Sequence, residues 1–403
     1  MRLLGLHINH GFSPEARVFA GLLRHRGDDY SALVLHHAYP VDAAPAAAGS
    51  TGATDADAAD RFASEANVEV FRFDGGYRPW SARRSLAEKV RGAAQFQVSL
   101  RRLLPVARAF APDVVYSNQQ AADCLAATFL ARRLARPQII HLHYHIGPWL
   151  KRPVLDRLRT CDHVVAISDF IRACGLEHGI APGRITTVRN ALDAAPFSPP
   201  SPESRAWVRR ELGLAPDAAL VGIVSRLDPG KGHEDTIDAF ARVAARHPGS
   251  HLVVVGDGTE RAAYEAHARR QTACADRIHF LGRRADVPRL LPGFDLFCHP
   301  SRAEPFGLAV LEAAASGLPI LAYDEGGTPE IVRDGETGFL APPGDVAALA
   351  DKMSLLLERP DLRREMGDAG RRRAVDEFRP EDAAEQFARV LKRVARHPTG
   401  TPG

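Results

Sequence analysis

The chain has 403 residues, more than one ordinary hydrophobic core accommodates, and this length suits two domains. Hydrophobic residues make up 45% of the chain and charged residues 25%, a balance typical of soluble globular proteins, and no apolar stretch is long enough to predict a transmembrane helix. The net charge at pH 7 is only +3, so we expect no nucleic acid partner.

Apolar strands alternate with amphipathic helices over residues 1–195, which predicts an N-terminal Rossmann-like domain with a parallel sheet. Ser13, Pro14 and Glu15 resemble the capped start of a helix that runs to about Arg26. Residues 40–60 are rich in small and polar residues, which predicts a flexible loop. Residues 81–110 predict one long helix or two, with a kink at Pro105. The expected strands cover residues 2–8, 32–36, 68–73, 113–117, 138–143, 163–167 and 185–188.

A proline-rich stretch separates this domain from a second one. We expect residues 196–216 to be a linker and residues 217–378 to be a C-terminal Rossmann-like domain that binds the nucleotide part of a ligand. Residues 379–403 predict a helix that packs back on the N-terminal domain, followed by a tail. Ligands of such sheets bind at the carboxyl ends of the strands, so we expect the site in a cleft between the domains. The expected strands of the second domain cover residues 220–225, 252–255, 278–281, 296–299 and 319–322.

The cysteine pattern and the first residues indicate a cytoplasmic protein. The apolar run at the start of the chain is interrupted by Arg2 and His7 and lacks the long apolar core of a signal peptide. The cysteines are scattered without a C-x-x-C pair, which favours reduced, partly buried thiols over a disulfide framework or a zinc site. They are Cys124, Cys161, Cys174, Cys274 and Cys298. Basic residues outnumber acidic ones in the first half of the chain, which favours solvated helix faces and leaves peripheral contact with the inner membrane face open.

The most informative motif is a pair of glutamates on either side of a strand-to-helix turn. Glu304 follows a predicted strand, Gly307 opens a predicted helix, and Glu312 lies on the first turns of that helix. The free N–H groups at such a helix start suit phosphate or sugar oxygens. A carboxylate at position 312 could accept two hydrogen bonds from vicinal ribose hydroxyls.

A second motif places two cations between glycines after another predicted strand. Arg226 and Lys231 lie in this turn, and Gly230 and Gly232 allow a ligand to approach closely. By charge and geometry the turn suits a diphosphate. It does not match the Walker A pattern, so a P-loop nucleotidase is not indicated.

These residues resemble the retaining family-4 glycosyltransferases of the GT-B fold, which have two Rossmann-like domains and a central cleft. The resemblance rests on both motifs, on residues 256–258, on residues 190–197 and on residues 326–330, and it covers nearly the whole chain. It implies that Arg226 and Lys231 hold the donor diphosphate and that Glu312 binds the ribose. It further implies that Glu304 and the backbone of three successive residues contact the donor sugar. These three are Phe306, Gly307 and Leu308.

The N-terminal domain departs from the family pattern in two places. The family has a Gly-Gly loop after the first strand, of which only Gly11 is present, as a candidate donor contact. The family also ends a later strand with a histidine that faces the donor sugar, and His143 is the candidate here. His141 and His145 remain alternatives, because side chains alternate along a strand and all three would share one face.

Two further patterns are interpreted as coincidences. Asp55 and Asp57 form the D-x-D string of metal-dependent glycosyltransferases, but they fall in the predicted loop. Residues 256–261 lack the third glycine of a dinucleotide fingerprint, so NAD is not expected. We therefore expect no metal and no cofactor.

The sequence predicts a retaining, metal-independent hexosyl- or glycosyltransferase. The donor is expected to be a nucleoside diphosphate sugar, with a UDP-sugar favoured and a GDP-sugar still open, and the acceptor a saccharide, a lipid or a small molecule. Cell-envelope polysaccharide synthesis is the expected setting. The alternatives are a GT-B-type sugar-nucleotide epimerase, a phosphorolytic enzyme and a non-catalytic nucleotide-sugar-binding protein.

Overall fold

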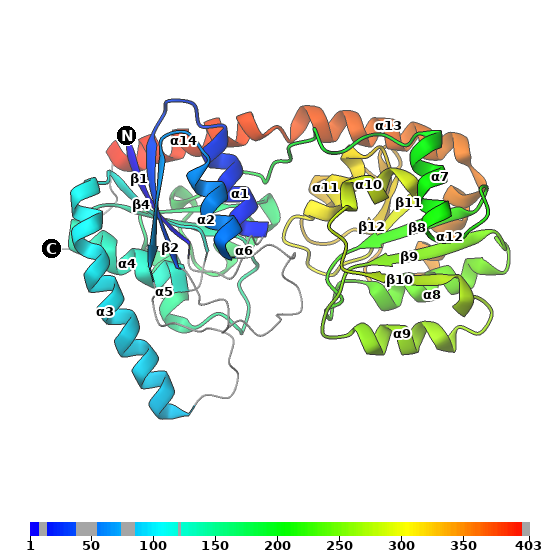
Figure 1. The fold of residues 1–403 in the computed structure, drawn as a ribbon, viewed down its shortest axis with the longest axis horizontal. Helices are drawn as coiled ribbons and strands as arrows, with labels where there is room; N and C mark the ends of the chain where they lie inside the picture. The colour runs from blue at the N-terminus through cyan, green and yellow to red at the C-terminus, as the bar shows by residue number, and fades with distance from the viewer. Residues whose placement is uncertain (8–13, 38–54, 74–84, 120–121, 397–403) are drawn as a thin grey trace. The chain divides into compact units, whose positions relative to one another are not determined.

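A computed structural model describes residues 1–7, 14–37, 55–73, 85–119 and 122–396. The chain divides into two compact units. The first unit holds residues 1–189 together with residues 380–403, and the second unit holds residues 190–379 (Figure 1). Within the described ranges, no helix combines the length and the apolar character that a membrane span requires.

The first unit is a seven-stranded parallel sheet in the order β3-β2-β1-β4-β5-β6-β7, with helices between the strands. Its strands are β1 (Arg2–His7), β2 (Ser31–His37), β3 (Val68–Phe73), β4 (Val114–Ser117), β5 (Gln138–Leu142), β6 (His163–Ala166) and β7 (Ile185–Thr187). Its helices are α1 (Pro14–Arg24), α2 (Asp55–Ala63), α3 (Leu86–Phe110), α4 (Ala122–Leu134), α5 (Arg152–Thr160), α6 (Asp169–Glu177) and α14 (Pro380–Arg396), with a 3-10 turn η2 (Pro182–Arg184).

The central strands of this sheet are buried along their whole length. Every residue of β4, β5 and β6 is buried, as expected for parallel strands that have helices on both faces. On one face, Leu4 and Leu6 of β1 share a hydrophobic cluster with Leu103 of α3 and Leu130 of α4. The terminal strand β3 is only partly buried.

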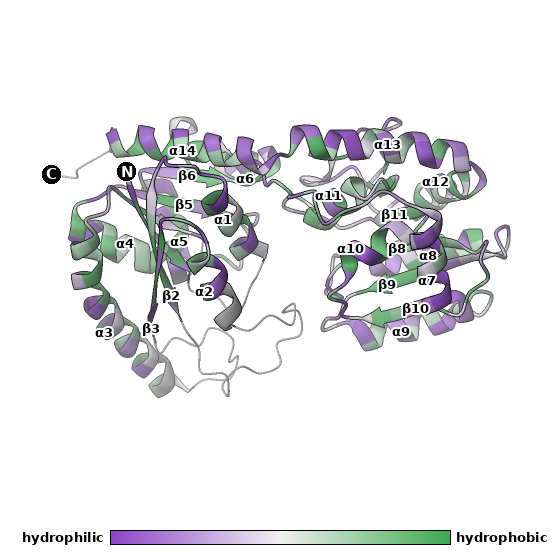
Figure 2. Ribbon diagram, turned by 45° about the horizontal axis from the view of Figure 1, so that its top comes forward, coloured by the Kyte–Doolittle hydropathy of each residue, from purple (hydrophilic) through white to green (hydrophobic). Residues whose placement is uncertain are grey.

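The last helix of the chain, α14, completes the first unit and packs on α1. Figure 2 shows hydrophilic and hydrophobic residues alternating along it, and its apolar side is buried. The ring of Phe387 makes edge-on contacts with Tyr30 and with Tyr116. Lys392 pairs with Asp29. Sequence-distant segments therefore share one core.

The second unit is a six-stranded parallel sheet in the order β10-β9-β8-β11-β12-β13. Its strands are β8 (Ala219–Val224), β9 (Ser250–Val255), β10 (Ile278–Gly282), β11 (Leu296–His299), β12 (Ile320–Tyr323) and β13 (Gly338–Ala341). Its helices are α7 (Pro202–Glu211), α8 (His233–Ala244), α9 (Arg261–Arg270), α10 (Val287–Leu290), α11 (Leu308–Ala315), α12 (Val346–Glu358) and α13 (Pro360–Glu377). Three 3-10 turns complete it, namely η3 (Ala275–Arg277), η4 (Leu291–Gly293) and η5 (Thr328–Glu330).

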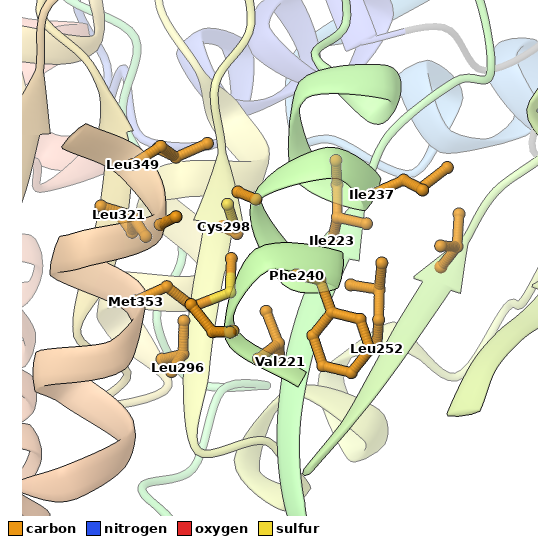
Figure 3. Packing of buried hydrophobic residues seen from close by; sticks show 14 of the residues in the cluster. Val221, Ile223, Ile237, Phe240, Leu252, Leu296, Cys298, Leu321, Leu349 and Met353 are labelled. Carbon is orange, nitrogen blue, oxygen red and sulfur yellow. The ribbon is translucent and has the colours of Figure 1, made fainter. Parts of the chain in front are cut away.

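The core of the second unit lies between its sheet and two helices (Figure 3). Phe240 projects from α8 and Met353 from α12, toward strand residues such as Val221, Leu296 and Cys298. All of these side chains are fully buried. The predicted fold class, two Rossmann-like α/β units with parallel sheets, is confirmed.

Two local predictions were wrong or incomplete. Residues 55–60, predicted as the end of a flexible loop, belong instead to helix α2 (Asp55–Ala63). Alanine favours the helix there, and Ala59 and Phe62 are buried against the unit, which the reading of small residues as low complexity overlooked. The range 196–216, predicted as a linker, contains α7, whose N-terminus is capped by Ser201 and has Pro202 in its first turn. Within the predicted helical segment 81–110, residues 86–110 form the single helix α3, with Pro105 inside it.

The strand order reverses between β8 and β11 in the second unit and between β1 and β4 in the first. Ligands of open α/β sheets bind outside the carboxyl ends of the strands at such a switch point. In the second unit, the loops that leave β8 and β11 contain the two sequence motifs described above. The fold therefore places both motifs at the position where a ligand is expected.

Candidate functional site

Glu304 lies at the centre of the polar groups in the second unit. The loop that leaves β11 carries it, and its carboxylate Oε2 accepts a hydrogen bond from Lys231 Nζ at 2.8 Å and one from Ser301 Oγ at 2.8 Å. His299 Nε2 lies 3.6 Å from the same oxygen. Lys231 comes from the loop after β8, so the two motifs meet in space.

The electrostatics of Glu304 follow from these neighbours. Burial alone would raise the pKa of the Glu304 carboxyl, but His299 and Lys231 hold that pKa well below its usual value. The carboxylate is therefore ionised at neutral pH. Its side chain keeps 14% of its surface accessible, so it can meet a ligand.

Close backbone contacts hold the Glu304 loop between two glycine turns. A Cβ atom at Gly232 would lie 2.3 Å from the carbonyl oxygen of Pro300, and one at Gly326 would lie 2.5 Å from that of Glu304. The amide of Gly327 donates to the Glu304 carbonyl at 2.7 Å. Glycine is required at these positions because no side chain fits, and the loop has little freedom to shift.

Arg226 leaves the end of β8 and is largely exposed, with 56% of its side-chain surface accessible. Its guanidinium pairs with Asp228 at 2.8 Å, and Asp228 also accepts from the amide of Thr259 at 3.3 Å. The amide of Leu227 donates to the Asp257 carbonyl at 3.0 Å. The turn with Gly256 and Gly258 therefore fixes the Arg226 loop, so the role of these two glycines is structural.

The helix after the Glu304 loop presents the remaining donor-site candidates. Gly307 precedes α11 with a positive φ of 105°, which favours glycine. Phe306 is buried and its ring contacts Phe378, so it can offer a ligand only its backbone. Leu308 is the first residue of α11, and Glu312 is partly buried on the next turn.

In the first unit, a group of polar rings lies at the carboxyl ends of neighbouring strands. The Tyr116 hydroxyl lies 2.6 Å from His141 Nδ1, and the rings of His141 and His143 are 4.2 Å apart. Asn118 Nδ2 lies 3.2 Å from Nδ1 of His7. Burial lowers the pKa of His141 to about 3 and also lowers the pKa of His143, so both rings are neutral.

The strand geometry separates the three candidate histidines. β5 ends at Leu142, so the alternation expected to put all three on one face does not extend to His145. His145 instead packs edge-on against Trp149, 6.3 Å away between ring centroids. His141 and His143 remain together, and both are buried.

Other sequence candidates lie partly outside the described residues. Gly11 lies outside the described residues, so its donor contact stays a prediction. Asp55 and Asp57 stand at the start of α2, in a helix and not in the predicted loop, and their side chains are outside the description. All five cysteines are free and buried. Among the described residues, no group of three or more His, Cys, Asp or Glu side chains suits a metal ion.

Sequence reasoning missed three residues that complete the site. Asp228 pairs with Arg226, and Ser301 and His299 surround Glu304. All three lie within the quoted motifs or next to them. Their residue types alone gave no signal, because each contact depends on which loop folds against which.

Comparison with known proteins identifies the family. The sequence profile described as Glycosyl transferases group 1 matches residues 205–373, and the one described as Glycosyltransferase Family 4 matches residues 54–195. The chain is 30% identical over 332 residues to the glycogen synthase of Mycobacterium tuberculosis, an alignment that covers 76% of each chain. The chain belongs to the family-4 glycosyltransferases with the GT-B fold.

One further relative and one solved structure show the breadth of the similarity. The chain is 33% identical over 213 residues to a protein of Corynebacterium glutamicum named GDP-mannose-dependent monoacylated alpha-(1-6)-phosphatidylinositol monomannoside mannosyltransferase, covering 50% of this chain and 55% of that protein. Alignments with several curated relatives span little more than half of their length. The fold resembles that of HepE from Anabaena, crystallised with UDP and glucose, with a TM-score of 0.77 and 23% identity over 98% of this chain and 100% of that chain.

Proposed function

We propose that this protein is a glycosyltransferase that moves a sugar from a nucleoside diphosphate sugar to an acceptor hydroxyl. The observation that carries the proposal is the meeting of Lys231 and Glu304, 2.8 Å apart, at the strand-order reversal of the second unit. Arg226 lies on the same loop as Lys231, and Glu312 lies on the helix that follows Glu304. At this edge of the sheet, the two cations suit a diphosphate, and the two carboxylates suit the hydroxyl groups of a ribose and a sugar.

Arg226 and Lys231 are assigned to the diphosphate. Negative charge builds on the leaving group as the glycosidic bond breaks, and cations fixed in place stabilise that charge. With two cations available, no divalent metal is needed for this task. The reaction is therefore proposed to be metal-independent and to need no cofactor.

Glu312 is assigned to the ribose hydroxyls, and Glu304 to the donor sugar. The backbone amides of Phe306, Gly307 and Leu308 lie at the start of α11, where N–H groups lack partners within the helix. They are assigned to the sugar and the adjoining phosphate. Gly11 is proposed as a further donor contact.

The reaction is proposed to retain the configuration of the donor. A double displacement needs a carboxylate at the anomeric carbon, and the motif carboxylates Glu304 and Glu312 are assigned to other tasks. The acceptor oxygen instead attacks the anomeric carbon from the face that the phosphate leaves. The bond from that carbon to the phosphate oxygen breaks, and the departing phosphate takes the acceptor proton. His143, a neutral imidazole, is assigned to hydrogen bonds with the sugar or the acceptor.

The donor is proposed to be a UDP-sugar, with a GDP-sugar as the alternative. HepE was crystallised with UDP and glucose, whereas the C. glutamicum relative is named for GDP-mannose, so both nucleotides are kept as candidates for this chain. The acceptor is proposed to be a saccharide, a lipid or a small molecule of the cell envelope.

Calorimetric titration with UDP-glucose, UDP-N-acetylglucosamine and GDP-mannose tests the proposal. We expect one nucleotide class to bind and Lys231→Ala to weaken that binding. Incubation with the bound donor and candidate acceptors then tests transfer. Absence of binding by every nucleotide sugar to the folded protein would contradict the proposal.

A further inference from the structure

The carboxylate of Glu304 makes all of its observed polar contacts through one oxygen. Lys231 Nζ and Ser301 Oγ each lie 2.8 Å from Oε2, and His299 Nε2 lies 3.6 Å from it. Within the described parts of the chain, no polar contact reaches the other carboxylate oxygen, Oε1. One oxygen is thus held by the protein, and the other remains for a ligand.

Lys231 cannot serve Glu304 and a ligand equally well. In the proposed function its ammonium group stabilises the donor diphosphate, yet here it is paired with Glu304. When a diphosphate draws Lys231 away, Glu304 loses its closest cation. A poorly solvated carboxylate without partners is unfavourable in free energy. Other groups must therefore donate hydrogen bonds or supply positive charge to Glu304.

Ser301 is suited to hold Glu304 permanently. Its side chain is almost fully buried, and its hydroxyl lies 2.8 Å from Glu304 Oε2 but 3.3 Å from the Gly230 carbonyl oxygen. A hydroxyl has one proton to donate, and the shorter contact with the charged oxygen takes it. The hydrogen bond remains when Lys231 leaves.

His299 is suited to replace the lost charge. It is buried with 2% of its surface accessible, and within the described residues neither ring nitrogen has a hydrogen-bond partner. Its ring stacks on Phe297, which fixes its plane. Glu304 Oε2 lies 3.6 Å from its Nε2, Lys231 pairs with that same oxygen, and His233 is a further titratable neighbour.

The other histidine beside His299 is engaged through its Nε2 atom. His233, the first residue of α8, lies 2.9 Å from Ser225 Oγ and 3.1 Å from the Arg226 carbonyl oxygen. Burial lowers the pKa of His233 to about 4, so this ring stays neutral near pH 7. His299 therefore remains as the histidine at this edge that can act on the Glu304 carboxylate.

We propose that Ser301 and His299 are positioning residues that keep Glu304 ionised and oriented while Lys231 turns to the donor diphosphate. This inference rests on the proposed function. His299 takes up a proton as the donor binds and becomes the cationic partner of Glu304 Oε2. Oε1 then faces the sugar in a fixed direction. Donor binding is coupled to proton uptake, and no covalent bond changes in this step.

The first experiment measures binding of UDP-glucose, or of GDP-mannose if that is the nucleotide bound, to Ser301→Ala. We expect about tenfold weaker binding or more, because a hydrogen bond to a charged group is lost. Ser301→Thr keeps the hydroxyl and should restore most of the affinity. In a Glu304→Gln background the effect of Ser301→Ala should nearly vanish, because no charge remains to be held.

A matched control exists on α12. Ser354 Oγ lies 3.0 Å from Glu358 Oε1, and His247 Nε2 lies 3.6 Å from that oxygen, but the Glu358 side chain is 57% exposed. Ser354→Ala also removes a hydrogen bond from serine to glutamate, but far in sequence from the loops that carry Lys231 and Glu304. It should leave nucleotide-sugar binding unchanged. Circular dichroism and thermal melting confirm that each variant is folded.

The second experiment measures proton uptake by titrating the same probe in two buffers of different ionisation enthalpy at pH 7.5. Wild type should take up a fraction of a proton more than His299→Gln, which keeps an N–H donor but cannot carry a charge. Equal uptake in the two proteins would overturn the role of His299. Unchanged affinity in folded Ser301→Ala would overturn the role of Ser301. If wild type binds neither UDP-glucose nor GDP-mannose, the proposed function itself fails, which is a distinct outcome.

Discussion

The hydroxyl of Tyr116 and Nδ1 of His141 are 2.6 Å apart, a short hydrogen bond between the adjacent strands β4 and β5. It fixes the ring of His141, against which His143 packs at 4.2 Å. The two histidines therefore differ in environment, because one is held by a buried phenol and the other lies beyond the end of its strand.

Among the histidines, His143 is expected to matter most for transfer. Alanine replacements of His141, His143 and His145 should each be compared in kcat and KM with the identified donor. His143→Ala should lower kcat most, because it removes the group assigned to the sugar or the acceptor. His145→Ala should have the smallest effect, since that ring packs against Trp149. Greatest sensitivity at His145 would show that the assignment along this segment is shifted.

Glu312→Ala is expected to weaken donor binding while leaving the fold intact. Loss of a charge-assisted pair of hydrogen bonds to ribose should cost about 1.5–3 kcal/mol of binding free energy. Calorimetry with the nucleotide sugar and with the free nucleoside diphosphate measures this loss. Both ligands carry the ribose, so both should be weakened alike. An unchanged affinity in the folded variant would remove Glu312 from the ribose site.

Lys231→Ala is expected to slow turnover on the order of 10²-fold, the usual cost of removing one preorganised group that stabilises developing charge. The loss should appear in kcat as well as in KM, because the negative charge grows toward the transition state. Steady-state kinetics with saturating acceptor is the measurement. Wild-type kcat in this variant would exclude a role for Lys231 at the leaving group.

Gly326→Ala is expected to disturb the Glu304 loop, and Gly335→Ala serves as its control. Both glycines have positive φ, 70° and 75°, so both alanines carry the strain of that conformation. Only at Gly326 would the new Cβ also meet backbone atoms, those of Glu304 at 2.5 and 2.7 Å, whereas Gly335 has open space. Gly326→Ala should therefore lose about 1–3 kcal/mol more of the free energy of unfolding than Gly335→Ala. Equal denaturant midpoints would argue against a tightly held loop.

Metal dependence and product stereochemistry are tested together. Transfer should continue in EDTA, because Arg226 and Lys231 supply the positive charge at the diphosphate. The double variant of Asp55→Ala and Asp57→Ala should keep nearly all of the transfer activity.

NMR of the product from an α-linked donor should show an α-linkage. A strict need for Mn²⁺ would contradict the cation assignment, and a β-linked product would contradict retention.

The sequence predicted the two parallel-sheet units because their strands carry local apolar patterns. It also identified the loops at the switch point, since Glu304 and Lys231 lie in motifs that pattern and resemblance both recognise. The contact between them could not be predicted from local pattern, because they lie 73 positions apart in the chain. The roles of Ser301 and His299 as neighbours of Glu304 depend on the same loop packing.

Errors arose where composition was read without tertiary context. The Ala- and Asp-rich residues of α2 looked like a loop, but burial of Phe62 anchors them as a helix. The prolines around α7 looked like a linker, although Pro202 begins the helix there. For the histidines, the alternation argument held only while the strand lasted, and β5 ends one residue before His143.

The membership of α14 in the first unit has a consequence for the order of events during synthesis. Residues 1–189 leave the ribosome first, but the ring of Phe387 that contacts Tyr30 and Tyr116 is made only after residues 190–379. The second unit has all of its strands before the first unit has its last helix. During this interval the nascent first unit exposes the apolar face that α14 later covers. We expect chaperones to bind that exposed face until α14 has been synthesised.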